Sequence, residues 1–132
     1  MTAFLEIRGL HGQYGFLVEE IGKPATAGPA IYLYLKPHRF TQWELLFVGQ
    51  TDDLETMLAD RLTDPGFIAA ARLGATHFAY MAASEEERER SIIERDIVVC
   101  RTPPCNFEVE PDRFSHEDGM IRVAPLPPGD GT

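Results

Sequence analysis

Apolar and polar residues alternate along two parts of the first fifty residues. The segments 4–9 and 14–20 alternate on either side of the turn sequence LHGQ and predict an N-terminal β-hairpin. The stretch 22–29, rich in glycine and proline, predicts a turn and linker. The segments 30–36 and 44–49 then alternate again, and the proline-containing loop between them predicts a second hairpin.

A helix is predicted directly after the second hairpin. Asp52 or Asp53 is suited to cap its N-terminus, and Glu55 in the first turn faces the positive end of the helix dipole. Its apolar residues recur at helical spacing: Leu54, Met57, Leu58 and Leu62.

Residues typical of helix ends predict a second, shorter helix before the next strand. Asp64 stands at the N-cap position, Pro65 at the first helical position, and Gly74 closes the far end. The segment 76–83 has the composition of a third strand of the central sheet. The segment 84–100 combines a charged face with an apolar stripe and predicts a long helix, which two prolines end.

Length and composition favour one domain with an extension at each end. The chain has 132 residues, of which 44% are hydrophobic, enough to bury one core. We expect residues 1–28 to be a hairpin and linker packed on the domain, and residues 29–107 to be its core. Residues 108–132 form a C-terminal extension, in which 120–123 predicts one strand and the remaining proline and glycine predict partial disorder.

The chain has the composition of a soluble cytoplasmic protein. No segment approaches the roughly 18 consecutive apolar residues that span a membrane, and the first residues do not resemble a signal peptide. Its two cysteines, Cys100 and Cys105, are too few for a disulfide framework or a closed zinc site, and we expect buried free thiols.

The net charge of −9 argues against a nucleic-acid partner. An acidic surface repels phosphate backbones at long range, whereas nucleic-acid-binding domains are usually basic. The charge therefore favours a protein partner, and nothing in the sequence predicts binding to a membrane.

Four short elements in order along the chain resemble the GIY-YIG nuclease superfamily. They are AIY at 30–32, FVG at 47–49, Glu94 in the long helix, and Asn106 just after the two prolines. Each element alone is a weak indication, but the twelve-residue spacing from Glu94 to Asn106 is the one expected of the family. The resemblance covers roughly residues 29–107.

The resemblance implies an α+β fold, with a small three-stranded antiparallel sheet flanked by helices; here the N-terminal hairpin would be an addition. It also implies a metal-dependent phosphodiesterase site. In the family, two tyrosines activate water, an arginine on the first helix stabilises the charge on phosphorus, and a glutamate holds one divalent cation. Such groups are needed because water is a poor nucleophile and the five-coordinate phosphate carries extra charge. Glu94 would be the Mg²⁺ or Mn²⁺ ligand, and without a second carboxylate in the motif we expect weak binding.

Several residues match the family pattern. Tyr32 stands at the tyrosine of the first motif, although Ala30 replaces its glycine. Gly49 matches the glycine at the end of the second motif, where the chain turns closely toward the helix. Glu94 and Asn106 also match.

Other residues depart from it. Phe47 stands where the second tyrosine is expected and has no hydroxyl to handle a proton. Met57 stands where the arginine is expected, and Gln50 stands where lysine is common in the repair-nuclease branch. Arg61, four residues after Met57, is the possible substitute if one continuous helix carries both on the same face. Losing two such groups commonly costs about 10³ or more in rate.

Each matching residue also has a structural interpretation. Tyr32 fits an ordinary strand position with a solvated hydroxyl, and Glu94 fits one more solvated charge on an acidic helix. Asn106 fits a residue that caps the turn after the prolines.

We therefore expect a GIY-YIG-like domain that is catalytically impaired and serves as a binding or structural module, which makes enzymatic activity uncertain and less favoured. The alternative is a divergent metal-dependent endonuclease acting on DNA or RNA in repair, recombination or defence through Tyr32, Arg61 and Glu94. A positive patch around the site would favour the alternative, because a local patch can overcome an unfavourable net charge. Its members would be Lys23, Lys36, Arg39, Arg61 and Arg72.

Overall fold

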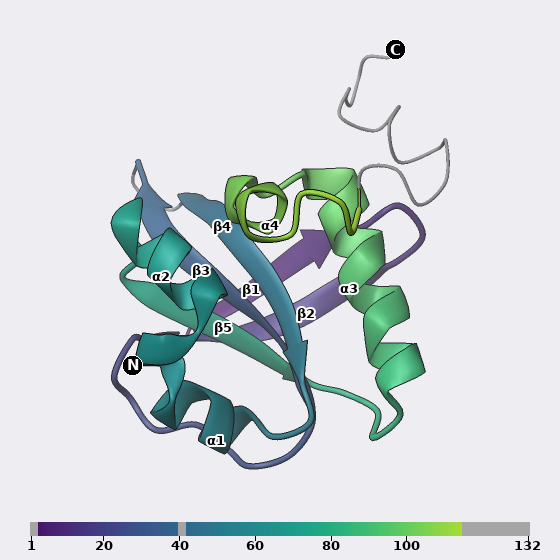
Figure 1. The fold of residues 1–132 in the computed structure, drawn as a ribbon, viewed down its shortest axis with the longest axis horizontal. Helices are drawn as coiled ribbons and strands as arrows, with labels where there is room; N and C mark the ends of the chain where they lie inside the picture. Colours follow the sequence, from purple (N-terminus) through teal and green to yellow (C-terminus); the bar gives the residue numbers. More distant parts are fainter. Residues whose placement is uncertain (1–2, 40–41, 115–132) are drawn as a thin grey trace.

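The computed structural model describes residues 3–39 and 42–114, which form one antiparallel sheet of five strands with helices around it (Figure 1). The strand order is β1-β2-β5-β3-β4. The strands are β1 (Ala3–Arg8), β2 (Gln13–Glu20), β3 (Ala30–His38), β4 (Gln42–Thr51) and β5 (His77–Ala82). The helices are α1 (Leu54–Ala59), the 3₁₀ helix η1 (Arg61–Thr63), α2 (Pro65–Arg72), α3 (Glu87–Arg101) and α4 (Pro104–Val109).

The expected mixed α+β class, with an antiparallel sheet flanked by helices, is confirmed. The three strands expected for the core are β3, β4 and β5, and the additional N-terminal hairpin does not form a separate unit but extends the same sheet to five strands. Strand β2 pairs with β5, with Leu17 opposite Tyr80. An alternating hairpin and the free edge of β5 each present unpaired backbone groups, and pairing them satisfies both.

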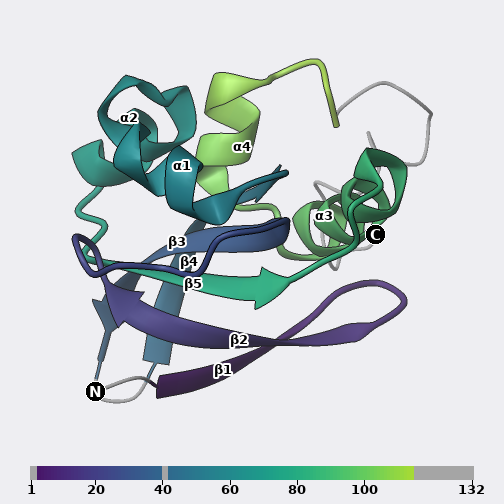
Figure 2. The same cartoon turned by 90° about the horizontal axis from the view of Figure 1, so that it is seen from below.

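The central strand β3 is apolar on both sides because both faces of the sheet are covered. Ile31, Leu33 and Leu35 point into a core shared with the β1–β2 hairpin and α3. Tyr32 and Tyr34 point the other way, into a core shared with α1, α2 and α4. In Figure 2, α1, α2 and α4 lie on one side of the sheet, and β1 is its outermost strand on the opposite side.

The helix caps expected for α1 and α2 are present, whereas α3 begins after Glu86 without a side-chain cap. Asp53 accepts a hydrogen bond from Thr56 N at 3.2 Å at the start of α1. Asp64 accepts one from Phe67 N at 3.0 Å at the start of α2, with Pro65 in its first turn. After α2, Gly74 has φ of +100°, a left-handed conformation that costs glycine little.

The first helix is shorter than expected, and Leu62 is not part of its buried stripe. Helix α1 ends at Ala59, and the chain tightens into η1 through bonds from Thr63 N to Asp60 O and from Asp64 N to Arg61 O. This tight turn lets α2 begin directly afterwards, and it leaves Leu62 72% exposed.

The C-terminal part is more ordered around the prolines than the sequence suggested. Helix α4 begins at Pro104 and contains Asn106, where only a turn was expected. Phe114 is buried against α3. The strand predicted at 120–123 lies outside the described residues. Over the described ranges, no helix has the length and apolar character needed to cross a membrane.

Candidate functional site

Tyr32 and Gly49 face each other across the β3–β4 hairpin. A Cβ atom built on Gly49 would lie 2.5 Å from Tyr32 Oη, so the tyrosine ring lies directly over the glycine backbone. Ala30, the replacement for the first-motif glycine, is an ordinary buried strand residue opposite Thr51. The close approach of Tyr32, and not a special backbone angle, therefore requires glycine at position 49.

Tyr32 belongs to an aromatic cluster on the α1, α2 and α4 side of the sheet, and little of the residue is exposed to solvent. Its ring centroid lies 5.6 Å from that of Tyr34 and 6.2 Å from that of Phe47. Tyr32 is 5% exposed and Phe47 6%. Phe47 also stacks on Tyr34, its partner in the strand register. Phe47, which stands where the resemblance places a second tyrosine, thus packs in the core as an apolar ring without a hydroxyl.

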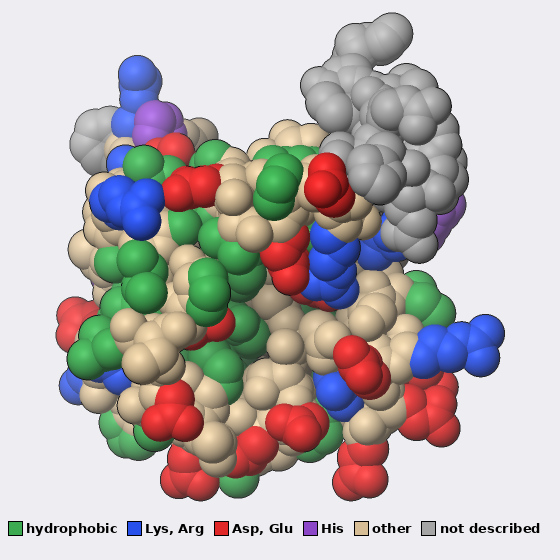
Figure 3. Space-filling view, in the orientation of Figure 1, with side chains coloured by type: hydrophobic (Ala, Val, Ile, Leu, Met, Phe, Trp, Pro, Cys, Tyr) green, Lys and Arg blue, Asp and Glu red, His purple; other side chains and the backbone are tan. Residues whose placement is uncertain are grey.

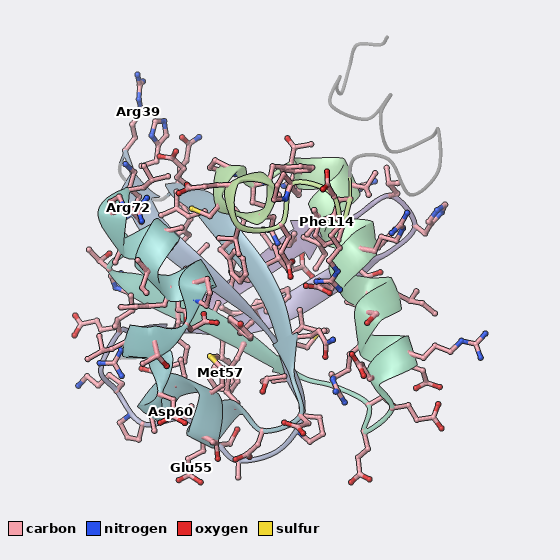
Figure 4. All side chains as sticks on the ribbon, viewed as in Figure 1. Arg39, Glu55, Met57, Asp60, Arg72 and Phe114 are labelled. Atoms are coloured by element: carbon pink, nitrogen blue, oxygen red, sulfur yellow. The ribbon has the colours of Figure 1, made fainter. Side chains whose placement is uncertain are left out.

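Met57 packs against the tyrosine that the resemblance does not implicate. Tyr34 Oη donates a hydrogen bond to Met57 Sδ at 3.7 Å, a weak contact typical of thioethers. Figure 4 shows Met57 between α1 and the sheet. The position where the family carries an arginine is therefore part of the apolar seam between α1 and β3.

Arg61 is not one helical turn beyond Met57 on the same face, because α1 has ended before it. Its Nη1 donates to Leu58 O at 2.9 Å, and its guanidinium carbon lies 5.7 Å from the centre of the Phe67 ring. Its Nε is buried without a hydrogen-bond partner among the described residues. Its charge partly lowers the pKa of Tyr34, against the larger effect of burial. Arg61 thus belongs to the Tyr34 end of the cluster.

Glu94 is buried and paired, not a solvated helix charge. It is 2% exposed on α3. Arg113 Nη2 donates to Glu94 Oε1 at 2.6 Å and Arg113 Nη1 to Glu94 Oε2 at 3.1 Å. The same guanidinium bonds Glu110 Oε1 at 3.1 Å. Both carboxylate oxygens at the expected metal position are therefore occupied by one arginine from the segment after α4.

Besides burial, the charges of three carboxylates act on the pKa of Tyr32. Burial raises the pKa of Tyr32, and the charges of Asp64, Glu94 and Glu110 raise it further. Burial likewise raises the pKa of Glu94, and Arg113 offsets part of that rise. Burial also raises the pKa of Asp64. A tyrosine in these surroundings keeps its proton at neutral pH, which makes it a poor base.

Asn106 anchors the edge strand β4 and does not merely cap a turn. Its Nδ2 donates to Val48 O at 2.8 Å, and its Oδ1 accepts from Val48 N at 2.9 Å. Asn106 is completely buried. The side-chain amide replaces the neighbouring strand that β4 lacks on this edge, so the match to the family asparagine has a structural explanation.

Gln50, at the position that is often lysine, ties β4 to α3. It accepts a hydrogen bond from Arg90 Nε at 2.7 Å and donates one to Ser91 Oγ at 3.4 Å. Arg90 Nη1 also donates to the carbonyls of Ser84 and Glu85, both at 3.0 Å. Arg90 is 5% exposed and holds the start of α3 against the hairpin.

The positive residues proposed as a patch are dispersed. Lys36 donates to Leu73 O and Arg72 to Glu108, while Lys23 and Arg61 line a separate pocket of about 230 Å³ beside α1. In Figure 4, Arg39 and Arg72 lie at the opposite end of the molecule from Glu55 and Asp60. Figure 3 shows acidic and basic side chains interspersed over this face, with no continuous basic surface.

The arrangement does not fit a divalent cation. Within the residues that the structure describes, no group of three histidine, cysteine, aspartate or glutamate side chains could hold a metal ion. Glu94, the implied ligand, already accepts two hydrogen bonds from Arg113, and Arg113 also donates one to Glu110. A metal would have to displace Arg113.

Sequence reasoning missed Arg113, Glu110 and Asp64 as members of this site. Arg113 and Glu110 stand in the predicted extension, outside the 29–107 range of the resemblance, and Asp64 was interpreted only as a helix cap. The available signal was weak: PDRF places an arginine just after an acidic helix end, but a short surface segment gives no indication of what it will contact.

Family models, curated proteins and solved structures were all compared with this chain, and none of them matches it.

Proposed function

We propose that this chain is a non-catalytic GIY-YIG-like domain that acts by binding another protein. The single observation that carries the proposal is the two-pronged contact between Arg113 and Glu94. It neutralises the residue expected to hold the metal, with a group supplied by the same chain. A buried carboxylate in such a contact supports packing and not metal chemistry.

The other catalytic positions support the same conclusion. Phe47 and Met57 are core residues of the α1 and α2 side of the sheet. Tyr32 is buried with its pKa raised, and Arg61 is engaged with Leu58 O and the Phe67 ring. Among the described residues, the cation that contacts Glu94 is Arg113, and it is already paired with Glu94 and Glu110, so it is not available to stabilise charge on a phosphate.

A protein partner is favoured over nucleic acid by the surface. Large apolar side chains are exposed along η1 and α2: Leu62 at 72%, Ile68 at 42% and Leu73 at 42%. Figure 3 shows hydrophobic side chains gathered over this part of the molecule, where α2 lies in Figure 1. Exposed apolar groups beside a net charge of −9 suit a protein surface better than a phosphate backbone.

A cleavage assay tests the proposal. Purified protein is incubated with supercoiled plasmid and labelled oligonucleotides in Mg²⁺ or Mn²⁺, and the wild type should cleave neither. The Phe47→Tyr/Met57→Arg double variant restores the hydroxyl and the guanidinium. Because Arg113 still pairs with Glu94 in this double variant, Mn²⁺-dependent nicking above the wild-type level should appear only when Arg113→Gln is added, once thermal melting shows that the triple variant folds. Adding Glu94→Gln should then remove that activity.

The opposite result would establish the divergent nuclease instead. It is robust cleavage by the wild type that is lost in both Glu94→Gln and Arg61→Ala, with Glu44→Gln on the edge strand β4 as the control outside the site. Fluorescence anisotropy adds a second readout: binding to DNA or RNA should be no tighter than non-specific, roughly 10⁻⁴ to 10⁻⁶ M, and should weaken as salt rises.

A further inference from the structure

The two edge strands of the sheet differ in how far their outward backbone groups are bonded and covered. On the β4 edge, the outward backbone groups of Val48 are both bonded by the Asn106 amide, and α3 and α4 pack against the strand. On the β1 edge, Figure 2 shows no described element beyond the strand. An open edge is a template for pairing with another strand.

The register of the hairpin shows which backbone groups β1 presents outward. Gly9 N donates to Gly12 O at 2.7 Å, so this pair at the turn is hydrogen-bonded. Because hydrogen-bonded and non-hydrogen-bonded pairs alternate along an antiparallel ladder, the backbone groups of Phe4, Glu6 and Arg8 point away from β2. The strand contains no proline, lysine or bulge that would discourage pairing at this edge.

The outward side chains of β1 carry a charge pattern that complements itself. Glu6 and Arg8 are both exposed and lie on the same face of the sheet, two residues apart. In an antiparallel pair of identical strands related by a two-fold axis at Ile7, Glu6 of each copy lies opposite Arg8 of the other. The two strands then exchange two ion pairs and no like-charge contact.

Other two-fold positions along β1 are less favourable. A two-fold axis at Glu6 places the Glu6 side chains of the two copies opposite each other. An axis at Arg8 places the two Arg8 side chains opposite each other. An axis at Leu5 places Phe4 opposite Glu6 and forms no ion pair. The axis at Ile7 also brings Phe4, 65% exposed, toward the turn that carries Leu10, 51% exposed. Charge and apolar exposure therefore select the same register.

We propose that β1 is a homodimerisation edge, with two copies joined into a continuous sheet by antiparallel β1 strands in the Glu6-to-Arg8 register. A second copy is the occupant that this edge fits, because the same six residues supply both halves of each ion pair. This pairing does not depend on the non-catalytic role proposed above, and cleavage assays do not report on it.

Charge reversal gives a direct test by sedimentation velocity over a range of protein concentrations. The wild type should show a concentration-dependent dimer. In Glu6→Arg an arginine of each copy faces an arginine of the other, and in Arg8→Glu a glutamate faces a glutamate. Each single variant should raise the dimer dissociation constant at least about tenfold, because two attractive pairs become two repulsive ones.

An equimolar mixture of the two single variants is the decisive sample. In a mixed dimer every position 6 and position 8 again faces an opposite charge, so dimerisation should return to the wild-type level. The Glu6→Arg/Arg8→Glu double variant should also dimerise. Glu44→Arg, the same reversal on the opposite edge strand β4, is the matched control and should leave the dimer unchanged.

Three results overturn the proposal: a wild type that stays monomeric at the highest concentration, single variants that dimerise as the wild type does, or a mixture that stays monomeric. Circular dichroism and melting of each variant check folding. The mixture keeps the test valid, because two misfolded variants would not restore a dimer.

Discussion

Arg113 binds both carboxylate oxygens of Glu94, at 2.6 and 3.1 Å, and so joins the segment after α4 to the middle of α3. Glu94 is almost wholly buried, while the Arg113 side chain is 38% exposed. The arginine reaches in from the surface to compensate a buried charge. Removing Arg113 should therefore destabilise the fold mainly because Glu94 is left as a buried charge without a partner.

The first prediction concerns pH and this pair. Burial already raises the pKa of Glu94, and without Arg113 it should rise further. A carboxyl whose folded pKa exceeds its unfolded value stabilises the fold at low pH and loses that contribution as pH rises through the folded pKa. Arg113→Gln should therefore lower the free energy of unfolding by about 1–3 kcal/mol at neutral pH, the cost of leaving a buried acceptor without its partner, and by less near pH 4.

Urea unfolding of the wild type and Arg113→Gln at several pH values measures this difference. The matched control is Arg72→Gln, which breaks the exposed pair with Glu108 and should cost little at any pH. A loss that is the same at pH 4 and at pH 7 would show that Arg113 acts through packing alone.

The second prediction concerns metal. Since Arg113 occupies both oxygens of Glu94, calorimetric titration of the wild type with Mg²⁺ or Mn²⁺ should show no saturable site. Arg113→Gln frees the carboxylate and should bind Mn²⁺ more tightly than the wild type, and adding Glu94→Gln should abolish this gain. A submillimolar site in the wild type that Glu94→Gln removes would contradict the prediction.

The third prediction tests the contact of Tyr32 with Gly49. Gly49→Ala puts a Cβ against the tyrosine ring and should cost about 1–3 kcal/mol in the free energy of unfolding. In a Tyr32→Leu background the ring is absent and the same change should cost less, which a double-mutant cycle measures. Gly22→Ala cannot serve as a control for adding a Cβ atom, because Gly22 has φ of +105°, a conformation in which any side chain is strained. Equal costs in the two backgrounds would show that Tyr32 is not the cause.

The fourth prediction concerns Asn106, the only asparagine of the chain. Asn106→Ala leaves the N–H and carbonyl of Val48 buried without partners and should cost about 2–4 kcal/mol. Thermal or urea unfolding measures it. Gln13→Ala removes an exposed amide and should be nearly neutral. If Asn106→Ala is equally neutral, the amide does not anchor β4.

The fifth prediction concerns Asp96, which accepts hydrogen bonds from His11 N, Gly12 N and Tyr14 Oη at the turn of the β1–β2 hairpin. Burial, assisted by this hydrogen bond and the charge of Asp96, raises the pKa of Tyr14 to about 12. In Asp96→Asn the pKa of Tyr14 should fall toward 10, as tyrosinate absorbance will show, with Tyr14→Phe identifying its contribution.

The sign of the matching stability effect follows from the raised pKa. Tyr14 stabilises the fold below the unfolded value of 10.0 and loses this contribution between pH 10 and about 12. Asp96→Asn should show a smaller loss over that window. An unchanged Tyr14 titration in Asp96→Asn would mean that Asp96 does not raise the pKa of Tyr14 through this hydrogen bond and its charge.

Local patterns in the sequence determined the elements and several of their ends. The alternation around residues 30–36 and 44–49 predicted the β3–β4 hairpin, and Asp53, Asp64 and Gly74 predicted helix ends that the structure contains. These features depend on neighbouring residues along the chain, because a cap or a turn is satisfied within about four residues.

Tertiary structure alone decided the contacts on which the site depends. Glu94 and Asn106 have the same sequence spacing whether they serve chemistry or packing. The structural role is distinguished from the chemical one by two contacts. Arg113 binds Glu94, and the side chain of Asn106 bonds the backbone of Val48. The first partner is 19 residues away and the second 58, so no local pattern encodes them.

The same dependence on contacts between distant segments explains why the number of strands in the sheet and the position of Arg61 could not be predicted from the sequence. Whether the N-terminal hairpin packs on the sheet or joins it depends on the free edge of β5, which forms only when the chain has folded. Helical spacing placed Arg61 beside Met57, but the chain leaves the α-helix at Asp60 to start α2. The sequence by itself determined which segments are strands and helices; only packing between distant segments decided which buried charge meets which partner, because burial makes an unpaired charge too costly to tolerate.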